Sequence, residues 1–405
     1  MTARAEAPVD SGRRGDEIRI GVALSAMGFV LAGLGACVAI LARDLDEPTG
    51  RLALLSSGFA VGLLLVAVIG PRMLRRWQMP TVLALGSVVC AVGAVLIAVA
   101  PVYAVAIVGG LLVGLGGALL VLVAPLMLDG PTAAARLSRV NAVASGTGIL
   151  APLAIGTLDG QGPSGRLVMI AAAPPLLLLA LLTRRSRRSE ATPPWPAEED
   201  QAGVPVLIDS APAVGLGRKW RRVGRRVAMD VGVGWLRVVL AVAVEFCFVV
   251  WAVARLVATG LPMASAALLG SAFPIGMAVG RAIGPIRWRG WSPVLPSGAL
   301  AALGTLLVSL FDVPAVVALG LVVAGLGVAP LYPVTLASLV ATPGLSAARL
   351  SAIGALASGT AILVAPAALG VVARVVDLRT AYLVTLPLLA VLFLLSRRSG
   401  RASFV

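Results

Sequence analysis

The sequence predicts an all-α polytopic membrane protein with twelve transmembrane helices in two homologous six-helix halves. Hydrophobic residues make up 59% of the 405 residues and charged residues only 13%, whereas about 25% of a soluble domain is charged. A chain with so few charged side chains cannot cover the surface of a soluble protein. Much of this chain must therefore face lipid. The second observation is the number of long apolar segments, and the third is an internal duplication.

Twelve apolar segments are long enough to cross a bilayer, which takes about 20 helical residues. They lie near residues 20–42, 52–71, 79–100, 102–127, 138–158, 166–183, 235–257, 264–285, 293–311, 313–340, 348–373 and 380–396. The expected organisation is a polar N-terminal tail (1–19), a first half (20–183), a linker (184–234), a second half (235–396) and a C-terminal tail (397–405). The first apolar segment is too long for the core of a signal peptide, so we expect it to be retained.

The basic residues predict the orientation. Of the 33 Lys and Arg residues, 27 fall in the two tails, the linker and the other loops on the same side of the membrane. The remaining six fall on the other side: Arg43, Arg51, Arg166, Arg255, Arg374 and Arg379. Because basic residues concentrate on the cytoplasmic side, both termini are expected there. Lys219 is the only lysine, a bias typical of GC-rich coding, and the expected location is therefore a bacterial cytoplasmic membrane.

The linker combines a Pro-rich, acidic first part with a basic second part, 219–227. In the second part Trp220, Val223 and Val227 recur at helical spacing, which suits an amphipathic helix on the inner leaflet. The alternative is a generic basic flank of the seventh span, and Gly224 weakens the helix prediction. Either way, these charges indicate contact with anionic lipid rather than nucleic acid.

Three collinear matches reveal the duplication. Residues 136–150 and 349–363 are identical at ten of fifteen positions, and an Ala-Pro pair follows in each. The second and eighth spans share residues at an offset of 214, among them Phe59 and Phe273. The fourth and tenth spans share Gly-Leu-Gly at 114–116 and 325–327. The chain is therefore expected to contain two six-span halves in parallel orientation.

Two six-helix halves, a long basic central loop and a Gly-rich exit from the second span followed by arginines resemble the major facilitator superfamily. The family's loop signature is only partly present, since Gly70 and Arg75 match it, while Leu74 and Trp77 replace its Asp and second Gly. The second-half counterpart, Arg281 and Gly284, is similar to the family form. The resemblance implies cytoplasmic gating loops at these four matching residues.

Glu245 is the acidic residue placed deepest in any span, near the middle of the seventh. A carboxylate there costs at least ~2.5–3.5 kcal/mol on insertion scales, and such residues usually mark ion or proton pathways. We therefore interpret Glu245 as the proton-coupling residue, with a structural hydrogen-bonding role as the alternative. The stretch Val244-Glu245-Phe246-Cys247, followed by Trp251, is similar to the seventh span of fucose-permease-like members of the superfamily.

The candidate substrate-binding residues are aromatic or small and polar. Trp251 is a candidate for the cavity wall, with packing as the alternative, and Arg255 is expected at the rim. Tyr332 lies between two prolines, which predict a bend in the tenth span. The small polar candidates, which could equally serve close helix packing, are Asn141, Ser145 and Ser358.

The expected function is proton-coupled secondary active transport of a small solute by alternating access. The alternatives are a transporter-like sensor or scaffold without transport and a membrane-embedded lipid-modifying enzyme. Histidine is absent, the three cysteines lack a pairing pattern and no phosphate-binding loop occurs, so no cofactor, metal site or ATP coupling is expected. The expected partners are the solute, protons and lipid, with the chain a monomer. Since no basic residue could be placed deep in a span, the predicted solute is neutral or singly cationic.

Overall fold

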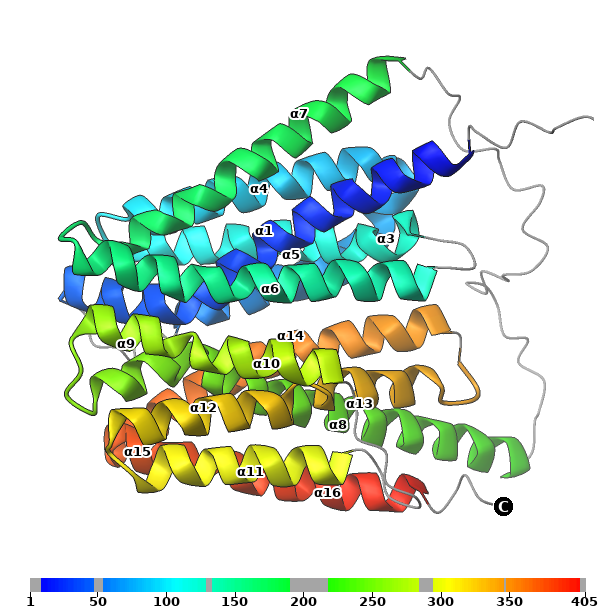
Figure 1. Ribbon diagram of the computed structural model, residues 1–405. Helices are drawn as coiled ribbons and strands as arrows, with labels where there is room; N and C mark the ends of the chain where they lie inside the picture. Colours follow the sequence, from blue (N-terminus) through cyan, green and yellow to red (C-terminus); the bar gives the residue numbers. More distant parts are fainter. Residues whose placement is uncertain are drawn as a thin grey trace, which may run out of the picture.

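The chain folds into an all-helical bundle in the computed structural model, which describes residues 9–400 except 47–53, 129–132, 190–217, 284–293 and 346. Figure 1 shows two layers of helices, with the N-terminal half above the C-terminal half. The first half contains α1 (Val9–Asp44), α3 (Leu54–Arg76), α4 (Met79–Val99), α5 (Tyr103–Met127), α6 (Ala133–Gly160), the 3₁₀ helix η1 (Gly165–Ala172) and α7 (Ala173–Ser189).

The second half begins with α8 (Arg218–Val257), followed by α9 (Met263–Gly270) and α10 (Ala272–Ile283). It continues with α11 (Val294–Leu310), α12 (Pro314–Val328), α13 (Leu331–Val340) and α14 (Ala347–Val375), and closes with α15 (Leu378–Ala381), η2 (Tyr382–Val384) and α16 (Thr385–Gly400). Ten helical segments among the described residues are long and apolar enough to cross a membrane, and two shorter apolar helices, Gly58–Gly70 and Val294–Leu310, occupy the other two predicted positions. The predicted fold class is confirmed.

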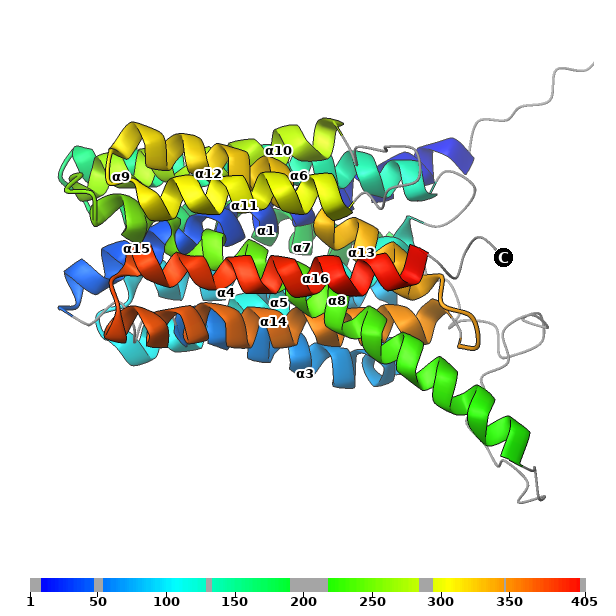
Figure 2. The same cartoon turned by 90° about the horizontal axis from the view of Figure 1, so that it is seen from below.

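Several helices extend beyond the apolar segments. α1 begins ten residues or so before the first predicted span, α7 runs to Ser189, and α8 starts at Arg218. The basic segment 219–227 is helical, but it forms the first turns of α8 instead of a separate surface helix, and Figure 2 shows α8 projecting from the bundle. Hydropathy detects only the apolar part of a helix, whereas the backbone hydrogen bonds of the helix continue into the polar residues beyond that part.

The tenth span is broken where the sequence predicted a bend. α12 ends at Val328 and α13 begins at Leu331, with Pro330 between them as the residue that caps α13. Proline lacks the N–H needed to continue the helical ladder. This break sets the direction of α13, which carries Tyr332.

The two halves repeat a backbone contact at residues that the duplication paired. A Cβ at Gly114 of α5 would lie 2.1 Å from the carbonyl oxygen of Phe59, and one at Gly325 of α12 would lie 2.4 Å from that of Phe273. Only glycine allows helix backbones to approach this closely. The matched glycines therefore hold equivalent helix pairs together, α3 with α5 and α10 with α12.

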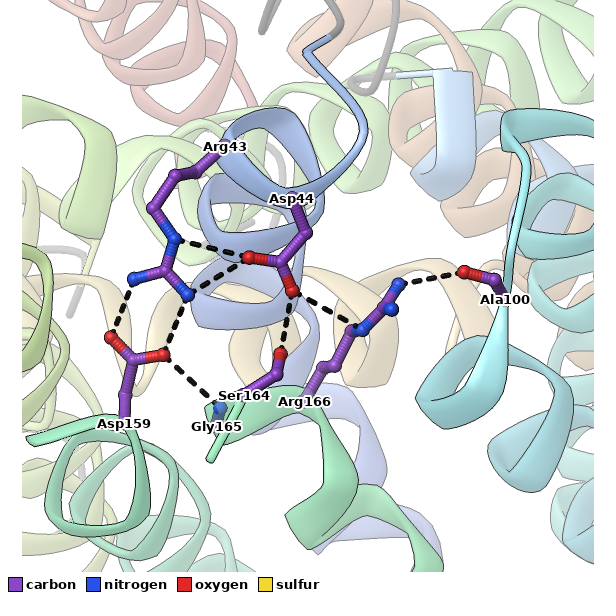
Figure 3. A network of polar contacts seen from close by, with 7 residues as sticks. All are labelled: Arg43, Asp44, Ala100, Asp159, Ser164, Gly165 and Arg166. Carbon is purple, nitrogen blue, oxygen red and sulfur yellow. Dashed lines mark hydrogen bonds and ion pairs between the residues drawn. The ribbon is translucent and has the colours of Figure 1, made fainter. Parts of the chain in front are cut away.

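α1 and α8 begin, and α7 and α16 end, at one end of the bundle, here called the linker end (Figure 1). At the other end, here called the far end, a polar network ties the first half together (Figure 3). Arg43 donates to both carboxylate oxygens of Asp159 at 2.8 Å and to Asp44 at 2.9 Å. Asp44 also lies 3.3 Å from Nε of Arg166, which donates to the Ala100 carbonyl at 2.8 Å. α1, α6, η1 and the end of α4 are thus joined.

A simpler cluster lies at the far end of the second half. Arg255 of α8 is buried and donates to Asp312 at 2.7 Å and to the Val308 carbonyl at 3.0 Å. Arg379 of α15 also pairs with Asp312 and donates to the Ser309 carbonyl at 2.8 Å. Arg255 is therefore a buried structural residue, whereas the sequence suggested an exposed rim position, because the carboxylate and the carbonyls of the α11–α12 connection replace water around its guanidinium.

Candidate functional site

A cavity of about 540 Å³ lies between the two halves. This volume falls within the range of about 300–1,000 Å³ found for small-molecule sites. Its wall is formed by α1, α3, α5 and α6 from the first half and by α8, α9, α10, α13 and α14 from the second. A site that both halves share is the arrangement that alternating access requires.

Close contacts between the halves lie in the middle of the bundle and at the far end. A Cβ at Gly35 of α1 would meet the Val249 carbonyl of α8 at 2.1 Å, and one at Gly156 of α6 would meet the Ala264 carbonyl of α9 at 2.7 Å. The lining residues of α5, Gly117 to Ala124, and the lining residue Arg281 of α10, in contrast, lie in the parts of these helices nearer the linker end. The cavity therefore extends from the middle of the bundle toward the linker end.

The cavity wall is mainly apolar. Its larger apolar side chains include Met27, Leu31, Phe59, Leu63, Phe246, Phe248, Phe273, Met277 and Leu336. The rings of Phe248 and Phe273 stack with their centroids 5.3 Å apart. The polar side chains of the wall are Asn141, Ser145, Glu245, Arg281, Tyr332 and Ser358. An apolar wall with a few polar groups suits an organic solute with a small polar part.

Among the described residues of this wall, Glu245 and Arg281 are the charged ones. Oε1 of Glu245 lies 3.6 Å from Nη2 of Arg281, and Nη1 of Arg281 donates to the Ser145 hydroxyl at 2.7 Å. The Glu245 side chain is 15% exposed and that of Arg281 is 40% exposed. Because Ser145 belongs to α6 and the other two residues to α8 and α10, this polar group crosses the boundary between the halves.

Tyr332 and the remaining small polar candidates also lie at the cavity. Tyr332 and Ser358 both line the cavity, and the Ser358 hydroxyl donates to the Gly354 carbonyl at 3.1 Å. Ser145 donates to the Asn141 carbonyl at 2.9 Å, and the side chains of both residues line the cavity. The structure therefore brings together four of the five predicted substrate-binding candidates with Glu245.

Trp251 is the candidate that the structure places elsewhere. Its side chain is buried, and its indole nitrogen donates to the Pro366 carbonyl of α14 at 3.0 Å. This carbonyl belongs to the Ala-Pro step inside α14, within a helix that packs against α8. This contact supports a packing role for Trp251 rather than a position in the cavity wall.

The four predicted gating residues differ in position. Gly70 is buried in α3 near Leu122, and Arg281 reaches the cavity. The side chain of Arg75 and the whole of Gly284 lie outside the described residues. Arg281 also corrects the expectation that no basic side chain reaches the solute site, because a long side chain at a helix end can reach inward as well as toward water.

The sequence carries a second signal for Arg281, separate from the loop signature. Phe273, Met277 and Arg281 line the cavity at intervals of four residues, which places them on the same face of α10. Such a stripe can be read from the sequence, but its direction depends on how α10 packs. Within the described residues, no group of three or more Cys, Asp or Glu side chains could hold a metal ion.

Comparisons with known proteins agree with this architecture. The sequence model of the Major Facilitator Superfamily matches residues 20–343. An inward-facing, unoccupied bacterial homologue of the human lysosomal transporter Spinster is similar with a TM-score of 0.70 and 14% identity over 98% of both chains. The nucleoside transporter NupG gives 0.68 at 15% identity over 96% of this chain and 100% of NupG.

The E. coli fucose:proton symporter FucP gives a TM-score of 0.56 at 17% identity, over 95% of this chain and 99% of FucP. All three identities are low, so these likenesses show a shared fold. A search of curated proteins found no match to the sequence.

Proposed function

This chain belongs to the major facilitator superfamily, and from that premise we propose that it is a secondary active transporter, coupled to protons through Glu245. Family and fold together make it a membrane transporter and not an enzyme. The observation that carries the proposal is the cavity between the halves, with a carboxylate near the middle of the bundle. Alternating access exposes such a site to one side of the membrane at a time.

Glu245 supports proton coupling by its position. It is the only carboxylate among the described residues that line the cavity. Membrane-embedded carboxylates commonly serve proton relays in transporters. A carboxylate that binds a proton on one side of the membrane and releases it on the other links proton movement to solute movement.

The test uses the full chain in liposomes that contain a pH-sensitive dye. Candidate organic solutes are added outside, and solute-driven proton movement is recorded for the wild type, for Glu245→Gln and for Asp230→Asn. Asp230 is an exposed acid on the same helix outside the cavity, so its variant is a matched control. We expect proton movement with at least one solute for the wild type and the control, and none for Glu245→Gln. Identical proton movement in all three proteins contradicts coupling at Glu245.

The proposed orientation places the linker end in the cytoplasm of a bacterial cell, with the chain acting as a monomer and its basic linker side toward anionic lipid. The support is the excess of basic residues in the loops and tails at that end. Single cysteines at Gln78, at the linker end, and at Gln161, at the far end, test it. The three native cysteines are buried, which keeps background labelling low. Labelling of Gln161→Cys but not Gln78→Cys by an impermeant reagent on intact cells is expected, and the reverse pattern overturns the orientation.

A further inference from the structure

The pair formed by Glu245 and Arg281 differs in geometry from the bidentate pair formed by Arg43 and Asp159. At the far end, Arg43 holds Asp159 with two bonds of 2.8 Å, the length typical of a strong charge-assisted hydrogen bond. Glu245 and Arg281 approach only to 3.6 Å through one oxygen and one nitrogen. The short bond of Arg281 goes to the neutral Ser145 hydroxyl. The guanidinium is therefore positioned by Ser145 and only loosely neutralised by Glu245.

Arg281, the positive member of this pair, is the more exposed of the two. The Arg281 side chain is 40% exposed, against 15% for Glu245, and both line the cavity. A guanidinium presents five N–H donors in a planar fork that matches the two oxygens of a carboxylate or phosphonate. A ligand's anionic group can thus bind Arg281 from the cavity with better geometry than Glu245 achieves.

The rest of the wall limits the charge and shape of that ligand. No second basic side chain lines the cavity among the described residues, so a second negative charge on the ligand would have no counter-charge. The remaining wall is chiefly apolar, with partly exposed side chains such as Met27, Leu31 and Phe246. These features fit one anionic group attached to an apolar body.

The negative charge of Glu245 opposes such a ligand, and a proton removes this opposition. An anion bound to Arg281 would lie within a few ångströms of the Glu245 carboxylate in a poorly solvated cavity, where like charges repel strongly. When Glu245 binds a proton, the ligand replaces it as the partner of Arg281 and the net charge of the site stays constant. Anion and proton therefore bind together, one for one.

Other ionisable groups near Glu245 do not change this exchange. Tyr332 of α13 also lines the cavity, and among the residues that the structure describes, α1, α3, α5, α6 and α14 contribute no charged side chain to the lining. Arg237 lies two turns away on α8 and donates to Ser338 of α13 at 3.0 Å. Arg255 is held by Asp312 at the far end.

From this geometry we infer that the solute is an amphipathic monoanion that binds Arg281 in exchange for Glu245 and is carried together with one proton. The inference rests on the proposed transport function, whose site it specifies. It replaces the neutral or cationic solute that the sequence suggested, because that expectation assumed a site without a basic side chain.

The test measures binding to the purified full chain by calorimetry between pH 5.5 and 8.5, with three six-carbon probes. Hexanesulfonate carries one negative charge throughout this range, hexanamide is neutral and hexylammonium is cationic. Hexanesulfonate is expected to bind best, with an affinity that rises toward low pH by up to about tenfold per pH unit, the slope for uptake of one proton. Glu245→Gln is expected to bind it equally well at every pH. Arg281→Gln is expected to lose about ten- to a hundredfold in affinity, as for a lost charged hydrogen bond.

A second measurement guards against variants that fail to fold. Thermal unfolding of each variant is recorded, and Asp230→Asn serves as the control for an acid lost outside the cavity. Preferred binding of hexylammonium that depends on Glu245 overturns the inference, as does hexanesulfonate binding that is unchanged in folded Arg281→Gln. Those results would leave proton-coupled transport intact. Anion binding without any solute-driven proton movement would instead overturn the transport proposal and leave the anion site standing.

Discussion

The two halves of this protein share one helical plan, yet they contribute differently to the central cavity. The first half supplies apolar and small polar side chains, including Asn141 and Ser145, whereas the second supplies both charged residues, Glu245 and Arg281. The close helix contacts at Gly114 and Gly325, in contrast, are the same in both. Duplication has therefore kept the packing that holds each half together, while the residues facing the cavity have diverged.

The far ends of the halves show the same combination of shared and divergent features. Arg166 and Arg379 lie 213 residues apart, close to the offset of the duplication, and each donates to carbonyls at the end of a preceding span. The acids differ, because Asp44 and Asp159 form ion pairs with the arginines of the first half, whereas Asp312 is the acid that, among the described residues, forms ion pairs with those of the second. Four of the six basic residues counted on the far side are thus structural. Their presence there reflects helix packing, whereas the count of basic residues was used to predict topology.

The largest expected effect comes from the charge that only the second half contributes. Glu245→Gln should abolish accumulation of solute against a gradient, because the amide keeps shape and hydrogen bonding but cannot exchange a proton. Counterflow exchange, which needs no net proton movement, should remain. Uptake and counterflow in liposomes measure the two activities. Accumulation equal to wild type would show that Glu245 has a structural role.

The next effect tests the packing that both halves share. Gly114→Ala and Gly325→Ala should each destabilise the protein by roughly 1–3 kcal/mol, since the added Cβ meets backbone, which cannot rotate away as a side chain can. Gly146→Ala and Gly298→Ala are matched controls, with open space at the added Cβ and an expected effect of at most about 1 kcal/mol. Thermal or denaturant unfolding in detergent measures all four. Unequal effects of the first two variants would show that the halves do not share this contact.

A smaller effect separates the two far-end clusters. Hydrogen bonds from Arg255 and then Arg379 hold the pKa of the Asp312 carboxyl below its ordinary value of 3.8. A lowered pKa stabilises the fold above the ordinary value, and this stabilisation is lost as the pH falls through the lowered one. Between pH 8 and about pH 4, Asp312→Asn should therefore unfold at a lower temperature than the wild type. Below about pH 4 this difference should disappear.

Asp159→Asn is the comparison in the first half. It should lower the unfolding temperature less than Asp312→Asn does, because Asp44 still lies beside both Arg43 and Arg166. Scanning calorimetry of the two variants at neutral pH gives the ranking. A larger loss for Asp159→Asn would mean that the bidentate bond to Arg43, rather than the number of counter-charges, sets the stability of these ends.

The smallest effect concerns a buried hydrogen bond in the second half. The hydroxyls of Thr305 in α11 and Thr385 in α16 lie 2.9 Å apart, and both residues are fully buried. Thr385→Val removes this contact, together with the bond of the Thr385 hydroxyl to the Tyr382 carbonyl at 2.9 Å, with little change in volume. It should cost about 0.5–1.5 kcal/mol. Thr305 keeps its bond to the Ala301 carbonyl, so no buried hydroxyl loses every partner. Denaturant unfolding measures the change. An unchanged free energy of unfolding would show that this bond does not stabilise the second half.

Much of this architecture was determined by the sequence itself. Hydropathy located the spans because each must match the thickness of a bilayer, and the repeated segments identified the two halves because paired residues keep equivalent contacts. Glu245 was found for a similar reason, since an acid within an apolar segment is conspicuous without knowledge of its neighbours. The bend before Tyr332 followed from proline chemistry alone.

Only the tertiary structure decided where long and amphipathic side chains point. Trp251 and Arg281 each lie within reach of several neighbours, and their own helices do not specify which one they contact. Packing of α8 against α14 turned Trp251 to a backbone carbonyl, and packing of α10 against α6 and α8 brought Arg281 to Ser145 and Glu245. Hydrophobic patterns fix the buried face of a helix, but the choice of partner on that face depends on distances between helices that are remote in the sequence.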